Sequence, residues 1–164
     1  MNSTREGNSS LHTGAILMFA AALAFIGYAI VFFYRNFYGT GFELGVETLN
    51  GSTQADLNAL NSAIVPYIKH LHAATAGFIA ATGIAVAALS WYGVRRGEMW
   101  AWIAAVVSPV VGLAVALPMH YLNLFNYDWE THLGPIYLAT AVFVVGALIA
   151  LKGLMGKSLP TQSV

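Results

Sequence analysis

Residues 15–33 read AILMFAAALAFIGYAIVFF and contain no charged side chain. Three further runs have the same character, at residues 73–89, 102–117 and 136–151. A helix needs roughly 20 apolar residues to cross a hydrocarbon layer of about 30 Å, and each run is close to that length. Because no water is present there to bond free peptide groups, each run is expected to form a helix. The sequence therefore predicts an all-α, multi-pass membrane protein.

The four runs organise the chain into a single integral membrane domain, residues 1–164. Charged residues make up 9% of the chain, against about 25% in soluble domains. A net charge of zero gives no basic patch, which argues against a nucleic-acid partner. The absence of cysteine excludes disulfides and thiolate chemistry. We predict a four-transmembrane-helix bundle with spans at roughly 13–35, 66–93, 100–120 and 134–153, outer loops 36–65 and 121–133, and an inner turn 94–99.

Basic residues set the expected orientation. Arg95 and Arg96 lie in the short turn between the middle spans, and Lys152 and Lys157 follow the last span. Cytoplasmic segments of membrane proteins carry an excess of lysine and arginine. We therefore expect a cell-membrane protein with both termini in the cytoplasm, where Arg5 agrees, and with its two longer loops outside.

The first outer loop is predicted to be structured. Ser52 and Thr53 precede Gln-Ala-Asp-Leu, so a hydroxyl cap is followed by the acidic side chain of Asp56 in the first turn. Apolar residues then recur at helical spacing, which indicates a short amphipathic helix. We expect this helix to bend at Pro66 into the second span.

The second span is rich in small residues. Gly77 is flanked on a helical wheel by Ala74, Ala81 and Ala85, and such a face lets neighbouring helix backbones approach closely. We therefore expect the second span to be the central, best-covered helix. The opposite face is expected to meet lipid or large side chains: Phe78, Val86 and Leu89.

Four of the five histidines are expected at one depth, at the outer ends of three different spans. They are His70 and His72, His120, and His132. Imidazole is the commonest metal ligand, and histidines on facing helices hold haem in membrane bundles. The cofactor that this pattern allows is haem b or a copper, zinc or iron ion. The alternative is that these are interfacial histidines with structural hydrogen bonds.

Helix geometry divides the histidines. His70 lies about 20° from Gly77 on the wheel and is expected to point into the bundle, whereas His72 is expected to face headgroups or the loop. The predicted metal set is therefore His70 with His120 and His132. Less direct roles, as oxygen ligands or as partners that orient an imidazole, are assigned to His72, Asp128 and Glu130.

The hairpin of residues 92–102, YGVRRGEMWAW, resembles that of small uncharacterised prokaryotic four-helix integral membrane proteins. In that group an Arg-Arg-Gly-Glu turn followed by Trp-Ala-Trp joins the two middle helices. The resemblance covers the second and third spans. It implies a fold and assigns no activity.

Two functions remain open from the sequence. No charged residue occurs within the apolar runs, which argues against a pump or ion-coupled transporter. The first function is that of a non-catalytic accessory or assembly subunit, in contact with the lipid bilayer and with other membrane subunits or a second copy of itself. The second is that of a haem- or transition-metal-binding membrane protein whose outer histidines serve electron transfer or oxidation chemistry. An enzymatic activity of the chain on its own is not expected.

Overall fold

A computed structural model describes residues 2–157, with side chains from residue 8 to residue 156. Arg5 and Lys157 therefore lie outside the described side chains. The described chain is helical with no strand, which confirms the predicted all-α class. The elements are α1 (Asn2–Tyr38), α2 (Gln54–Leu60), α3 (Ile64–Ala88), a π-helical turn η1 (Leu89–Gly93), a 3₁₀ turn η2 (Val94–Arg96), α4 (Met99–His120), α5 (Trp129–His132) and α6 (Gly134–Lys157).

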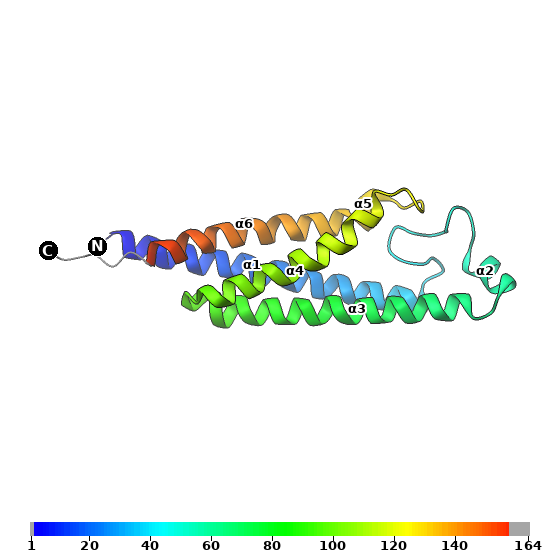
Figure 1. Cartoon of the computed structure of the whole chain (residues 1–164), viewed down its shortest axis with the longest axis horizontal. Coiled ribbons are helices and arrows are strands. Elements are labelled where there is room, and N and C mark those ends of the chain that lie inside the picture. The colour runs from blue at the N-terminus through cyan, green and yellow to red at the C-terminus, as the bar shows by residue number, and fades with distance from the viewer. Residues whose placement is uncertain (1, 158–164) are drawn as a thin grey trace.

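Four helices are long and apolar enough to cross a membrane: Asn8–Tyr38, Ile64–Arg96, Met99–His120 and Gly134–Gly156. The four predicted spans fall inside them. Figure 1 shows the start of α1, the α3–α4 turn and the end of α6 at one end of the bundle, which we call the hairpin end. The other end, the loop end, carries residues 39–63 and 121–133. The chain is a multi-pass helical membrane protein.

Helices α1 and α6 pack closely along their length, and glycine residues permit the close approach. A Cβ atom added at Gly14 would lie 2.6 Å from the Gly146 carbonyl oxygen. One added at Gly146 would lie 2.8 Å from the Met18 nitrogen, so neither position admits a side chain. Small residues at such crossings let membrane helices associate through close packing. As Figure 1 shows, α1 packs along both α6 and α3, so the central helix is the first span, and the expectation that it is the second is wrong.

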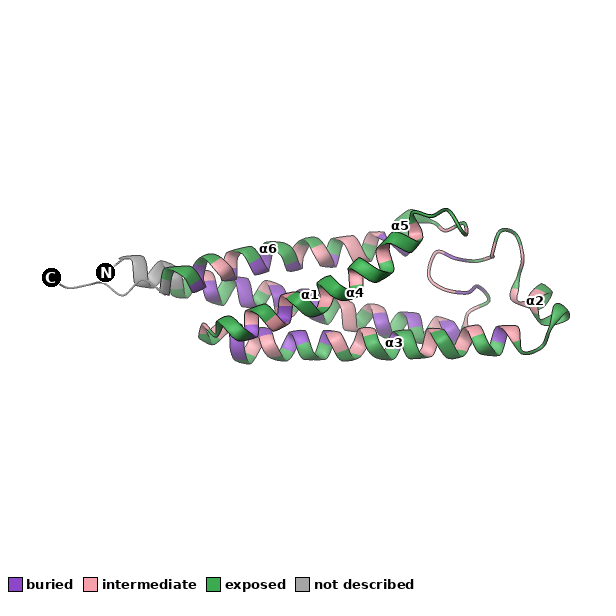
Figure 2. Ribbon diagram, in the orientation of Figure 1, coloured by how far each residue is buried: buried purple, intermediate pink, exposed green. Residues whose placement is uncertain are grey.

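The buried face of α3 differs from the predicted one. Its buried residues include Ala76, Gly83 and Val86, whereas Gly77 is exposed. Gly83 meets the Ala22 carbonyl oxygen of α1, where an added Cβ would lie at 3.2 Å. Val86 lies in the buried core with Met18 and Phe143, so of its two expected surroundings it has large side chains and not lipid. Figure 2 shows the alternation of buried and exposed turns along α3 that results.

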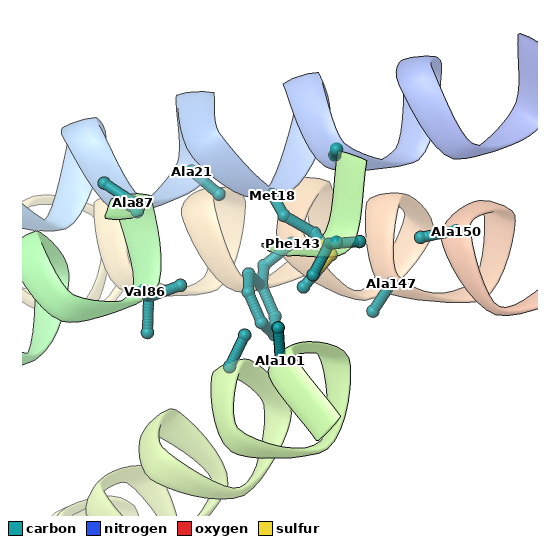
Figure 3. Close-up of a cluster of buried hydrophobic side chains, with 12 residues drawn as sticks. Met18, Ala21, Val86, Ala87, Ala101, Phe143, Ala147 and Ala150 are labelled. Atoms are coloured by element: carbon teal, nitrogen blue, oxygen red, sulfur yellow. The ribbon is translucent and has the colours of Figure 1, made fainter. Parts of the chain in front are cut away.

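The main core fills the hairpin half of the bundle. Met18 of α1 and Phe143 of α6 point toward Ala101 of α4 and Val86 of α3 (Figure 3). The Trp102 indole donates a hydrogen bond to the Ala147 carbonyl at 3.0 Å and so joins α4 to α6. The apolar core therefore holds all four spans together at this end.

The helix predicted in the first loop is present as α2. Thr53 caps it and forms a reciprocal pair with Asp56, in which each side chain bonds the backbone nitrogen of the other residue. Such capping boxes satisfy donors that a helix start leaves free. The bend into the next span lies at 61–63, because α3 already begins at Ile64 and includes Pro66 in its first turn. The expected bend at Pro66 is therefore wrong.

Candidate functional site: a histidine–carboxyl cluster at the loop end

A tight turn at residues 43–46 folds back against α5 and builds the site. The Gly45 carbonyl accepts from the Asp128 backbone nitrogen at 2.8 Å, and the Leu44 carbonyl accepts from His132 Nδ1 at 2.7 Å. Gly45 has φ +77, and an added Cβ would lie 2.8 Å from His132 Cβ. Only glycine fits here, because the turn needs both a left-handed backbone and close contact with α5.

His132 and His120 face each other across the site. Their Nε2 atoms are 2.8 Å apart, which is hydrogen-bond distance. His132 is fully buried, whereas His120 is half-buried at the end of α4. The second ring nitrogen of His120 lies 3.1 Å from the Ala116 carbonyl one turn earlier. The two imidazoles therefore form one chain of hydrogen bonds from Leu44 to Ala116, and we call this pair the histidine dyad.

The number of protons in the dyad follows from its acceptors. The carbonyl oxygens of Leu44 and Ala116 can only accept, so both Nδ1 atoms must carry hydrogen, and one more hydrogen must lie between the two Nε2 atoms. Two neutral imidazoles hold only two such hydrogens. With all three bonds made, the dyad carries one positive charge. Burial lowers the pKa of His132, against the raising effect of its bond to Leu44, so the surroundings of this ring disfavour its charged form.

Aromatic rings from the second loop enclose the dyad. The Tyr127 ring lies 5.6 Å from the His120 ring, edge to face, and 5.2 Å from the His132 ring. Its hydroxyl donates to the His120 backbone carbonyl at 3.2 Å. Phe125 covers the outer edge of His120 at 6.1 Å. These rings limit the access of water to the dyad and fix its geometry.

A carboxyl group and a third imidazole complete the cluster. Burial raises the pKa of Glu43, while the nearby His72 and His120 act in the opposite direction. His72 packs its ring against Phe32 of α1 at 5.3 Å, and its Nδ1 is buried with no hydrogen-bond partner among the described residues. Glu43, His72, His120 and His132 are called the loop-end cluster below.

The predicted metal set is not assembled. His70 is exposed, whereas His72 is the histidine that turns inward, so the expected orientations of these two residues are reversed. The reason is that α3 buries the face of Ala76 and Gly83, which His72 shares and His70 does not. Across the described residues, no group of three histidine, aspartate or glutamate side chains is arranged to hold a metal ion.

The two acidic candidates of the second loop have other surroundings. Asp128 caps α5, accepting from the Thr131 backbone nitrogen at 2.9 Å and from its hydroxyl at 2.7 Å. These bonds lower the pKa of Asp128. Glu130 is exposed on α5. Asp128 thus orients His132 through the helix that it caps, and not through a bond to the imidazole.

Sequence reasoning missed three contributors: the Glu43 carboxyl, the Leu44 carbonyl and Tyr127. One signal for the first two was present. Phe42 and Val46 form an apolar pair in an otherwise polar loop, and both are buried. An acidic residue between two buried apolar residues indicates a segment that folds back on the protein. For Tyr127, nothing separated this ring from the interfacial aromatic residues around it.

Comparison with family models, with curated proteins and with solved structures finds no match. The resemblance of the 92–102 hairpin to small prokaryotic four-helix proteins is not tested by these comparisons and stays a prediction.

Proposed function

We propose that this protein is a membrane-embedded binding protein whose loop-end cluster holds the polar part of a cofactor or substrate used in electron transfer or oxidation chemistry. The support is the convergence of Glu43 and His72 on the hydrogen-bonded histidine dyad. Ionisable groups within membrane proteins are costly to bury, and they mark ligand sites and proton paths. Groups of this kind, with shifted pKa values, gather at functional sites.

The basic turn supports an outward position for this site. Arg95 and Arg96 lie at the hairpin end, opposite the loop-end cluster (Figure 1). Arg95 stacks over the Trp91 ring at 4.2 Å, an arrangement suited to the membrane boundary. With the positive-inside rule, the hairpin end is cytoplasmic in this proposal and the cluster faces the exterior.

The donor set favours a hydrogen-bonded ligand over a metal ion or haem. Catalytic zinc and related ions use three protein ligands, whereas the dyad presents two imidazoles whose Nε2 atoms already bond each other. A metal or a haem iron between His120 and His132 would have to separate the two rings. Elemental analysis of the purified protein, together with its absorption spectrum, tests this part of the proposal.

The two histidines on α3 give a matched test. His72→Gln alters the cluster, whereas His70→Gln makes the same chemical change two residues away on the exposed face. We expect mass spectrometry of extracts from the purified wild type to show a bound small molecule that His70→Gln retains and His72→Gln loses. Equal content in the two variants, or a wild type with no bound compound, would contradict the proposal.

A second candidate function is that of an accessory subunit of a larger membrane complex. One observation favours it: the small residues of α3 that do not enter the bundle form an exposed face. An added Cβ at Gly77 meets nothing within 4 Å, and Ala74, Ala81 and Ala85 are also exposed. Small residues at this spacing let another membrane helix pack closely.

A native gel in mild detergent tests the subunit function. We expect the wild type to migrate as part of a larger complex and Gly77→Phe to disrupt that complex. Gly27→Phe is the control, because Gly27 is equally open but lies on α1. A wild type that stays folded and alone would count against this function.

A further inference from the structure

A cavity of about 340 Å³ lies between α3 and α4, with α1 and α6 behind it. It exists because α4 runs obliquely to the other long helices, as Figure 1 shows, and packs on α3 mainly near the hairpin end. Its walls are mostly apolar and include Phe25, Phe78, Leu113 and Phe143. Sites for small molecules are typically of about 300–1,000 Å³ and lined in this way, with a few polar groups that fix orientation.

The loop-end side of this cavity adjoins the cluster. Thr75 lines the cavity three residues after His72, and Ala116 lines it four residues before His120. Since a helix rises 1.5 Å per residue, each lies about one turn below a cluster residue. Tyr28 lines the cavity and interacts electrostatically with Glu43. The apolar space therefore leads from the membrane interior to the polar cluster.

Three polar groups at this junction have unused bonding capacity. The Glu43 carboxyl, the Tyr28 hydroxyl and His72 Nδ1 make no hydrogen bond among the described residues, and His72 Nδ1 is buried. Buried polar groups of proteins are almost always bonded, so the free ring nitrogen of His72 is suited to a hydrogen bond from a ligand. Together they offer a phenolic donor, an imidazole and a carboxyl group.

The charges around the junction select the head group of the ligand. Among the described residues, the groups that act on Glu43 are His72 and His120, with no lysine or arginine. Arg35 forms an ion pair with Glu47, with 2.6 Å between a guanidinium nitrogen and a carboxylate oxygen. Phosphate recognition relies on arginine, lysine or helix N-termini, and a carboxylate would repel it. A neutral head that accepts and donates hydrogen bonds fits these groups.

We propose that the cavity binds a membrane-soluble quinone or quinol, with its ring held by Tyr28, Glu43 and His72 and its apolar tail lying between α3 and α4. This inference rests on the proposed function, because it assigns a ligand class to the same cluster. A quinone carbonyl accepts from the Tyr28 hydroxyl, and a quinol hydroxyl donates to the Glu43 carboxylate or to His72. The tail leaves the site sideways into lipid, where such molecules dissolve.

Glycine positions make the cavity testable without disturbing the fold. An added Cβ at Gly112 meets nothing within 4 Å, although Gly112 lines the cavity, so Gly112→Leu fills the space that the tail needs. Gly27→Leu is the matched control on the open surface of α1. With a decyl-substituted benzoquinone as probe, native mass spectrometry should show at least tenfold weaker binding to Gly112→Leu than to the wild type. Ala116→Leu, one helical turn nearer the cluster, should act in the same way.

The head-group variants separate this inference from the proposed function. His72→Gln and Glu43→Gln should each weaken probe binding at least tenfold, whereas His70→Gln should leave it unchanged. Failure of the probe to bind the wild type, while another extracted compound is lost in His72→Gln, would overturn the quinone assignment and leave the cluster as the ligand site. A phospholipid as that compound would have the same meaning. Probe binding that is as strong in His72→Gln and Glu43→Gln as in the wild type would overturn both proposals.

Discussion

Replacing Gly45 with alanine tests how the loop-end cluster is held together. The substitution has two effects that the structure separates. Gly45 has φ +77, a left-handed conformation that costs an ordinary residue about 1–2 kcal/mol. The new methyl group would also lie 2.7 Å from the Thr131 hydroxyl and 2.9 Å from the Asp128 carbonyl oxygen. Overpacking of this kind costs a further about 1–3 kcal/mol.

Gly51→Ala carries the first effect without the second. Gly51 has φ +95, yet an added Cβ meets nothing within 4 Å, so this variant experiences the backbone strain alone. We therefore expect Gly45→Ala to weaken the contact between the turn and α5 by about 1–3 kcal/mol more than Gly51→Ala weakens its own turn. The difference should loosen the bonds that the turn makes through Gly45 and Leu44.

Amide hydrogen exchange gives a local readout of this loosening. The Asp128 nitrogen donates to the Gly45 carbonyl, so its exchange reports directly on the contact. If local opening controls exchange, about 1–3 kcal/mol corresponds to acceleration by about 5- to 150-fold, since each 1.4 kcal/mol is a factor of ten. Equal exchange at Asp128 in Gly45→Ala and Gly51→Ala would refute the account of a turn pinned to α5.

Three further predictions concern charge, packing and the aromatic cover. Burial raises the pKa of Glu43 in the folded state, so the stability that this group contributes is complete below about pH 4.5, its ordinary pKa, and is lost as the pH rises through the folded pKa. Unfolding by detergent titration across this pH range should show that loss in the wild type and not in Glu43→Gln. Gly146→Val should destabilise the bundle by at least about 1–3 kcal/mol, because its Cβ meets the Met18 backbone, and Gly27→Val should change little in the same titration. Tyr127→Phe keeps the ring over the dyad and removes the bond to the His120 carbonyl, so thermal unfolding should show a loss of about 0.5–1.5 kcal/mol, and an unchanged midpoint would mean that this bond adds no net stability.

The spans could be predicted from sequence because they depend on one local quantity. A bilayer demands about 20 apolar residues in succession, and no knowledge of neighbouring segments is needed to find them. The cap of α2 is local in the same sense, since Thr53 and Asp56 lie three residues apart. These features follow from short-range rules, and the structure contains both of them.

The facing of each helix could not be predicted in this way. Small residues permit close packing wherever they lie, and α3 has them on two faces, around Gly77 and around Gly83. Packing against α1, whose Ala22 carbonyl meets Gly83, determines which of these two faces is buried. Because His70 and His72 lie on different faces of α3, the error in the predicted buried face reversed the predicted orientations of both residues. Pairwise fit between helices is a property that a single-helix wheel does not contain.

The cluster itself depends on a contact between distant loops. Leu44 and His132 are brought together by a turn that requires glycine at position 45, and the resulting bond fixes the tautomer of His132. The spacing of residues along the chain does not predict the contact between Leu44 and His132. The sequence indicated that His120 and His132 share a depth, but the acceptor that sets their protonation is a backbone carbonyl. Side-chain types alone cannot reveal such an acceptor.

The proton count gives the loop-end cluster two forms that differ only in where one proton lies. In one form Glu43 is ionised and the dyad holds three hydrogens with all its bonds made; in the other Glu43 is protonated and one dyad bond is lost. Both forms have zero net charge over these groups, which matters because an isolated buried charge is far costlier than a compensated pair. A ligand that donates a hydrogen bond to Glu43 favours the first form, and one that accepts from it favours the second. If the proposed ligand occupies this site, its hydrogen-bonding groups would therefore bias where this proton lies, on the dyad or on Glu43.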